Sequence, residues 1–172
     1  NMKNKKFSVY LADITYINSF SSPQITIPLN IGFIMAYAEK HFKDHFEFKL
    51  FKDPKKLIKE IHKAPPDILG LSCYYWNMYF DVYAAGIAKK LNPDVKVVAG
   101  GPQIDFKHGD MAFKEEQFKL HKEFNGLCDF YAINEGELAF NNFLERYLKV
   151  NTESLFDMPI DGGVHFINEK EY

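Results

Sequence analysis

The chain has 172 residues, of which 47% are hydrophobic and 26% are charged, proportions that suit one globular domain and exclude global disorder or a second full domain. Its 21 basic and 23 acidic residues give a formal charge of -2. Without a basic field to neutralise phosphates, we expect no nucleic-acid partner.

Short β-type runs alternate with helical periods along the first half of the chain. A buried-type run at 7–12 precedes a hydroxyl-rich stretch, and a helix with apolar residues at helical spacing is predicted after Pro28. Apolar and charged residues alternate at 46–50, which indicates an edge strand with one solvent-facing side. Asp53 and Pro54 then predict the N-cap and first turn of another helix.

The second half continues the alternation. The run at 68–72 is apolar enough for a central strand buried on both faces. Five βα units predict a doubly wound, flavodoxin-like (Rossmann-like) α/β fold, in which a five-stranded parallel sheet of order 2-1-3-4-5 carries helices on both faces. The later predicted elements are a helix along Tyr79, Tyr83, Ile87 and Leu91, a strand at 95–99, a helix around 113–124, a strand at 130–133 and a helix around 140–148.

The regular pattern ends near residue 150. We therefore expect one domain over 1–150, followed at 151–172 by an irregular linker or hairpin. No internal repeat or low-complexity tract is visible in the sequence.

Cysteine usage and hydropathy indicate the cellular setting. The only cysteines are Cys73 and Cys128, and their predicted strands lie two spacings of ~4.8 Å apart with the residues at opposite strand ends, beyond the ~7 Å Cα limit of a disulfide. No apolar run approaches the ~18 residues that span a bilayer. We expect a cytoplasmic protein with no membrane partner.

Ligands of an open parallel sheet bind beyond the carboxyl ends of the strands, which directs attention to four loops. The loop at 13–26 contains neither a dinucleotide fingerprint nor a P-loop. Its hydroxyls leave flavin as a minor alternative, although it has no glycine for close backbone approach. After the fourth strand, Gly100 and Gly101 would let a bulky ligand lie against the backbone, or would simply form a tight turn.

Four motifs occur at these loops in order: Pro28-Leu29-Asn30-Ile31-Gly32, Asp67-Ile68-Leu69-Gly70-Leu71-Ser72, Val97-Val98-Ala99-Gly100-Gly101-Pro102 and Glu135-Gly136-Glu137. Together they resemble the N-terminal cobalamin-binding domain of the cobalamin-dependent radical S-adenosylmethionine (SAM) enzymes, over about residues 7–150. The resemblance implies that the dimethylbenzimidazole tail of cobalamin passes beside the sheet, while the corrin rests across the strand ends.

The resemblance also implies a set of cofactor-binding residues, without catalytic or metal-ligating ones. Structural roles remain open for several of them: Asp13 could cap backbone amides, Cys73 could be a small buried residue, and Glu135 could favour a helix N-terminus. The aromatic loop fits core packing as well as a ligand or domain surface. The set is Asp13, Ser72, Cys73, Tyr74, Tyr75, Trp76, Gly100, Gly101, Pro102, Glu135 and Gly136.

Two absences refine this interpretation. Two cysteines cannot supply the three ligands of a [4Fe-4S] cluster, so S-adenosylmethionine and the cluster are expected only in a C-terminal radical SAM domain of the parent chain. We expect this chain to be the cobalamin-binding module of a radical SAM enzyme that transfers a methyl group, and to be non-catalytic by itself. The alternative is a non-catalytic, flavodoxin-like ligand-binding or protein-interaction module.

The second absence concerns histidine. The loop after the first strand contains none, so cobalt is expected base-off and without a protein histidine, unless His108 bends back across Gly100 and Gly101. The pair His41 and His45 has a spacing that could hold zinc, but no third ligand is suggested nearby, so the pattern favours a solvated helix end.

Overall fold

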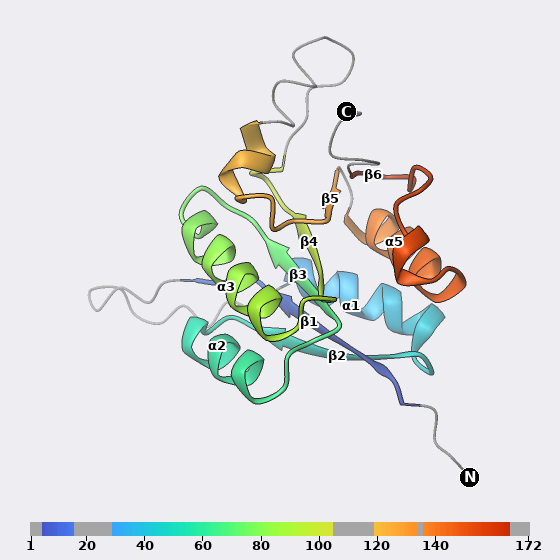
Figure 1. Ribbon diagram of the computed structural model, residues 1–172. Coiled ribbons are helices and arrows are strands. Elements are labelled where there is room, and N and C mark those ends of the chain that lie inside the picture. The colour runs from blue at the N-terminus through green and yellow to red at the C-terminus, as the bar shows by residue number, and fades with distance from the viewer. Residues whose placement is uncertain (1–4, 16–28, 105–118, 134–135, 166–172) are drawn as a thin grey trace.

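The computed structural model describes residues 5–15, 29–104, 119–133 and 136–165. Within them, six strands form one sheet in the order β2-β1-β3-β4-β5-β6 (Figure 1). The strands are β1 (Phe7–Ala12), β2 (Phe46–Phe51), β3 (Ile68–Ser72), β4 (Lys96–Gly100), β5 (Phe130–Ala132) and β6 (Gly163–Val164). The helices are α1 (Leu29–Phe42), α2 (Pro54–Lys63), α3 (Met78–Leu91), α5 (Gly136–Lys149) and the 3-10 turn η1 (Thr152–Ser154).

Strands β1 to β5 are parallel, so the predicted fold class and strand order are confirmed. The sequence did not predict β6, which pairs antiparallel with β5 through Tyr131 and Val164. A two-residue strand is too short to leave a pattern in the sequence. Gly162, with a φ of 85°, turns the chain back, and its carbonyl accepts a hydrogen bond of 2.9 Å from the Ile133 amide.

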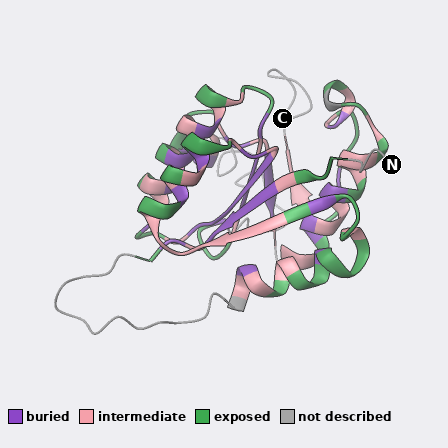
Figure 2. Cartoon of the chain, turned by 90° about the horizontal axis from the view of Figure 1, so that it is seen from below, coloured by how far each residue is buried: buried purple, intermediate pink, exposed green. Residues whose placement is uncertain are grey.

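The sheet separates two apolar layers. Helices α2 and α3 cover one face, while α1 and α5 cover the other (Figure 1). The central strands are largely buried between them, whereas the edge strands β2 and β6 are mostly of intermediate burial (Figure 2). Since successive strand residues point to opposite faces, Leu69 and Leu71 pack toward α2 and α3, whereas Ile68 packs toward α1 and α5.

Helix α3 packs on the sheet through a different face from the one that its apolar spacing traces. Tyr79 and Tyr83 are 91% and 59% exposed, although they belong to the apolar spacing from which the helix was predicted. The buried face instead consists of Asp81 with Ala84, Ala85 and Ala88. Small side chains let the helix lie close to the sheet, and this close packing outweighs the larger apolar area of tyrosine.

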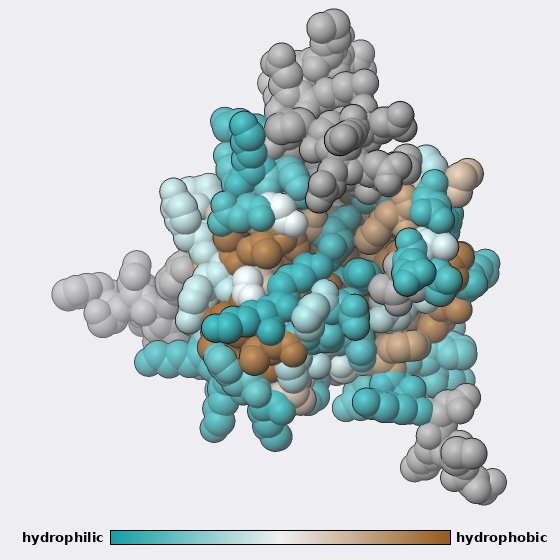
Figure 3. Space-filling model, in the orientation of Figure 1, coloured by the Kyte–Doolittle hydropathy of each residue, from teal (hydrophilic) through white to brown (hydrophobic). Residues whose placement is uncertain are grey.

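Other local predictions are confirmed. The Asp53 carboxylate accepts hydrogen bonds from the Lys55 and Lys56 amides at 2.8 and 3.3 Å, and Pro54 opens α2. Residues 119–123 are helical, but the rest of the helix predicted around 113–124 lies largely outside the described residues. None of the described helices has the length and apolar character needed to cross a membrane. The surface seen in Figure 3 carries several hydrophobic areas bordered by hydrophilic residues.

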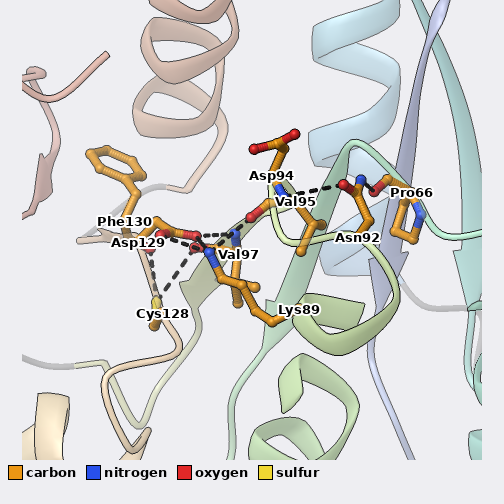
Figure 4. A network of polar contacts seen from close by, with 9 residues as sticks. All are labelled: Pro66, Lys89, Asn92, Asp94, Val95, Val97, Cys128, Asp129 and Phe130. Carbon is orange, nitrogen blue, oxygen red and sulfur yellow. Dashed lines mark hydrogen bonds and ion pairs between the residues drawn. The ribbon is translucent and has the colours of Figure 1, made fainter. Parts of the chain in front are cut away.

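A polar network joins the amino ends of β4 and β5 (Figure 4). Lys89 Nζ lies 2.6 Å from Asp129 Oδ2 and donates to the Val95 carbonyl at 2.8 Å. The Val97 amide donates to the same Asp129 oxygen at 2.7 Å. Asp129 therefore stabilises both the start of β4 and the last turn of α3, at the end of the sheet opposite the predicted ligand loops.

Replacing Asp129 with alanine should lower the free energy of unfolding by about 1.5–3 kcal/mol, because it leaves the Lys89 ammonium and the Val97 amide without their shared acceptor. Glu145→Ala is the control, since it removes the exposed Glu145–Lys149 pair and should leave stability close to that of the wild type. Urea unfolding followed by circular dichroism measures both. Equal midpoints for the two variants would contradict this role for Asp129.

Candidate functional site

A pocket of about 340 Å³ opens at the carboxyl ends of the central strands, on the face that α1 and α5 cover. Its floor is the sheet, through Leu11, Gly70, Val98 and Ala132. Ile31 and Ile34 of α1 and Phe140 of α5 form its apolar walls. The pocket includes the switch in strand order between β1 and β3, where ligands of doubly wound sheets bind.

The sheet surface beneath the pocket is recessed because Gly70, Gly100 and Ala132 carry little or no side chain. A Cβ on Gly100 would lie 3.5 Å from the Ala132 Cβ, and a Cβ on Gly70 would lie 2.6 Å from Leu11 Cδ2. Longer side chains at these positions would fill the space between sheet and helices. The result is an apolar slot that can admit a flat ring.

A polar corner borders the slot at the start of α1. The Asn30 amide nitrogen donates to Ser72 Oγ at 2.8 Å and lies 3.4 Å from the Tyr74 hydroxyl. Its oxygen accepts from the Ile31 amide at 2.7 Å. Burial raises the pKa of the neighbouring Asp13 carboxyl, and the Lys52 charge and a hydrogen bond with Asn30 partly oppose that rise. The corner therefore offers a ligand the remaining hydrogen-bonding capacity of Ser72 and Tyr74.

The turn after β4 requires glycine. Gly101 has a φ of 99°, and a Cβ there would lie 2.9 Å from both the nitrogen and the oxygen of Cys73. The two loops are joined by hydrogen bonds from the Cys73 amide to the Gly100 carbonyl at 2.6 Å and from the Gln103 amide to the Cys73 carbonyl at 3.1 Å. The double glycine therefore serves close backbone approach as well as a tight turn.

Asn77 holds the loop after β3 in place. Its side chain is fully buried, and its amide nitrogen donates to the Ser72 carbonyl at 2.9 Å and to the Ile14 carbonyl at 3.3 Å. Its oxygen accepts from the Tyr74 amide at 2.8 Å. One side chain thus fixes the ends of β1 and β3 and the backbone of a pocket residue.

The structure brings together six of the eleven predicted site residues. The pocket is lined by Ser72, Tyr74, Gly100, Gly101, Pro102 and Gly136.

The other five lie elsewhere. Asp13 is hydrogen-bonded to Asn30, and Cys73 is buried in the layer beneath α2 and α3. Trp76 is 48% exposed and stacks on Tyr74 with ring centroids 4.4 Å apart, while Tyr75 is 77% exposed. Glu135 lies outside the described residues. The assignment of these residues to the cofactor stays a prediction.

The sequence did not single out several residues that shape the site. Asn30 stood in one of the quoted motifs, and its place at the start of a helix beside the ligand edge was the available signal. Gly70 inside a strand could have marked a close approach. Ala132 and Asn77 left no signal, because the side chains that surround them come from distant parts of the chain.

The described histidines lie away from the pocket lining. His41 and His62 are in the last turns of α1 and α2, at the opposite end of the sheet. Burial lowers the pKa of His121, which contacts the Tyr131 hydroxyl at 3.4 Å, and His165 packs 4.9 Å from Phe156. His108 lies outside the described residues, which contain no cluster of three His, Cys, Asp or Glu able to hold a metal.

Comparison with known proteins gives the family. Residues 17–144 match the B12 binding domain. Over 127 residues the chain is 32% identical to the cobalamin-dependent radical SAM methyltransferase TokK of Streptomyces tokunonensis, covering 71% of this chain and 17% of that protein. Over 123 residues it is 31% identical to the 2-(S-pantetheinyl)-carbapenam-3-carboxylate methyltransferase of Streptantibioticus cattleyicolor, covering 69% of this chain and 16% of that protein.

A solved structure supports the fold. A novel cobalamin-binding protein from Desulfitobacterium hafniense DCB-2 superposes with a TM-score of 0.50 at 16% identity, covering 77% of this chain and 55% of that one. The chain spans about a sixth of the length of the two methyltransferases, 17% and 16%. The family match covers well over half of the chain and contains most of the pocket lining. The resemblance predicted from the four motifs is confirmed, and the chain belongs to the B12-binding domain family.

Proposed function

We propose that the chain is the cobalamin-holding module of a radical SAM methyltransferase, with the dimethylbenzimidazole tail of the cofactor in the pocket between the sheet and helices α1 and α5. The observation that carries this proposal is the slot above Gly70, Gly100 and Ala132. Absent or minimal side chains at three positions of one core face cost packing energy. A bound ring that fills the slot would recover that energy.

The residues of the slot fit such a tail. Ile31, Ile34 and Phe140 present apolar surface from the helices, and Leu11 and Val98 present it from the sheet. A flat, apolar heterocycle would bury both its faces between these two layers.

The polar corner suits the more hydrophilic part of the same cofactor. Because Asn30 already donates to Ser72 Oγ, the Ser72 hydroxyl hydrogen is free to donate toward a ligand oxygen. The amino end of α5 at Gly136 and Glu137 also borders the pocket, where unpaired backbone amides favour ligand oxygens. Glu137 adds a negative charge there, which favours uncharged oxygen atoms over a second anion.

The aromatic loop lies where the corrin is expected. Tyr74 lines the pocket and stacks on the half-exposed Trp76. These rings would orient the corrin across the strand ends. With no histidine at the described ligand edge, we propose that cobalt is base-off and lacks a protein histidine, its lower face being left to water or an uncharged side chain.

The methyltransferase assignment rests on the two relatives, whose names state that activity. Bound cobalamin supplies the methyl group that such a reaction transfers. We place S-adenosylmethionine and the [4Fe-4S] cluster in a C-terminal radical SAM domain of the parent chain, because Cys73 and Cys128 are buried and too few for a cluster.

The proposed domain boundary is near residue 150. The described residues after it remain in contact with the core, since Leu155 and Ile160 are buried and β6 extends the sheet. We propose that 151–172 leads from this packed segment to the catalytic domain.

One observation favours the alternative function, a protein-interaction module. Tyr75 and Tyr79 are 77% and 91% exposed outside the pocket, and tyrosine is enriched at protein interfaces. A non-catalytic module that binds a protein through this surface would explain them without cobalamin.

Reconstitution distinguishes the two functions. After incubation with hydroxocobalamin and desalting, the wild-type chain should retain the corrin absorbance. Ala132→Leu should weaken retention about tenfold or more, because a filled slot imposes the roughly 1–3 kcal/mol cost of overpacking on the tail. Ala36→Leu makes the same change on the exposed side of α1 and should behave like the wild type. A colourless wild-type protein would favour the protein-interaction module, and full retention by Ala132→Leu would contradict the placement of the tail.

Electron paramagnetic resonance of the Co(II) form tests the ligation. The reconstituted chain should give a spectrum without superhyperfine splitting from an axial nitrogen, because the described histidines lie away from the pocket and the tail nitrogen is proposed to lie in the slot. Splitting that disappears in His108→Ala would identify that histidine as a ligand. Splitting that persists in His108→Ala would show that the dimethylbenzimidazole remains bound to cobalt. Either result would contradict the proposed ligation.

A further inference from the structure

Asp81 is a buried acid for which the described residues offer, at most, the weak thiol donor of Cys73. It lies in the first turn of α3, its side chain is 0% exposed, and neither carboxylate oxygen has a described nitrogen or oxygen donor within hydrogen-bond distance. An ionised carboxylate in such surroundings is strongly disfavoured, because it loses hydration and gains at most one weak thiol donor in return. Natural structures rarely keep such a group without a reason.

Two titratable groups among the described residues act on Asp81. The Cys73 thiol comes from the loop after β3, and Asp13 comes from the end of β1 and is itself influenced by Lys52. Burial raises the pKa of Asp81 to about 8. A hydrogen bond with the Cys73 thiol opposes this rise, and the negative charge of Asp13 adds to it. Burial, reinforced by the Asp81 charge, also raises the pKa of the Cys73 thiol. At neutral pH both Asp81 and Cys73 are therefore uncharged.

Asp81 is directly connected to the loop that lines the pocket. Its amide donates to the Asn77 carbonyl at 3.0 Å, and the Asn77 side chain fixes Ser72 and Tyr74. Cys73 stands in the same loop. Loss of the Asp81 proton would thus act on the backbone of Ser72 and Tyr74 through Asn77, one helical turn away.

We infer that Asp81 is a proton-dependent positioning residue for the cofactor: the neutral acid allows the 72–77 loop to close over its side chain, and loss of the proton to solvent opens that loop and weakens cofactor binding. The carboxylate formed in this step gains hydration only if water enters beneath the loop, which separates residues 72–77 from α3. This inference rests on the proposed function for its link to cobalamin, but the loop transition itself requires no cofactor.

The direction of the pH effect follows from proton linkage. The folded chain keeps a proton on Asp81 that the unfolded chain releases near pH 4. The contribution of Asp81 to the free energy of unfolding is therefore fully present below about pH 4, and it is lost as the pH rises through about 8. Asp81→Asn, which is uncharged at every pH, should abolish this dependence.

Trp76 reports the loop without the cofactor. It is the single tryptophan of the chain and stacks on Tyr74, so opening of the loop should change its fluorescence and its quenching by acrylamide. The wild-type apo chain should show a transition between pH 7 and 9, and Asp81→Asn should show none. Asp94→Asn, which alters an exposed acid at the far end of α3, is the matched control and should keep the wild-type transition.

Corrin retention after desalting gives the second measurement. In the wild type the neutral fraction of an acid with pKa near 8 falls roughly tenfold from pH 7 to 9, and retained corrin should fall by a similar factor. In Asp81→Asn the ratio between the two pH values should be close to one. Tenfold loss in both proteins would assign the effect to another group and overturn the inference.

Four further outcomes are decisive. A flat wild-type Trp76 signal would overturn the inference, as would an unchanged transition in Asp81→Asn. If that variant does not fold, a carbon-13 titration of the wild-type Asp81 carboxyl replaces it, and an ionised carboxylate at pH 6 would overturn the inference. A normal Trp76 transition with no corrin retained at either pH would refute the proposed function and the link to cobalamin, while supporting the loop transition.

Discussion

The candidate site depends on one buried amide. Asn77 has no solvent exposure, and it uses both donors and its acceptor to join the Ile14 carbonyl, the Ser72 carbonyl and the Tyr74 amide. Buried polar groups must be satisfied, so this side chain permits few other loop arrangements. The pocket, the Tyr74–Trp76 stack and the environment of Asp81 all follow from the loop that Asn77 fixes.

One face and one end of the sheet provide stability, and the opposite face and end provide the ligand pocket. Toward α2 and α3 the core is filled, because Ala84, Ala85 and Ala88 let the helix approach closely. Toward α1 and α5 the positions of Gly70 and Gly100 leave a slot. The Lys89–Asp129 network ties the amino ends of the strands together (Figure 4), at a distance from the carboxyl ends where a ligand would bind. The sequence of the carboxyl-end loops can therefore serve ligand binding, because contacts at the amino ends of the strands stabilise the sheet.

The sequence predicted the site in part, and its omissions have physical causes. Glycine and loop position were sufficient to select Gly100 and Gly101, whereas Ser72 was selected through the family resemblance. The aromatic run Tyr74 to Trp76 was correctly located in a loop, but sequence spacing cannot say which ring faces a pocket. The structure places Tyr74 in the lining, Trp76 stacked on it and Tyr75 in solvent, in a loop whose backbone is held by the Asn77 hydrogen bonds.

By itself the sequence determined the element types, the parallel sheet and its order, because hydrophobic periodicity and the alternation of strands and helices leave few topologies. Four short motifs also determined the family. Only the tertiary structure decided which face of α3 is buried, that β6 adds an antiparallel strand at the edge of the sheet, and that Asp81 is buried beside Cys73 of the ligand loop. These features depend on side chains brought together from distant parts of the chain, and such contacts leave no period or spacing in the sequence.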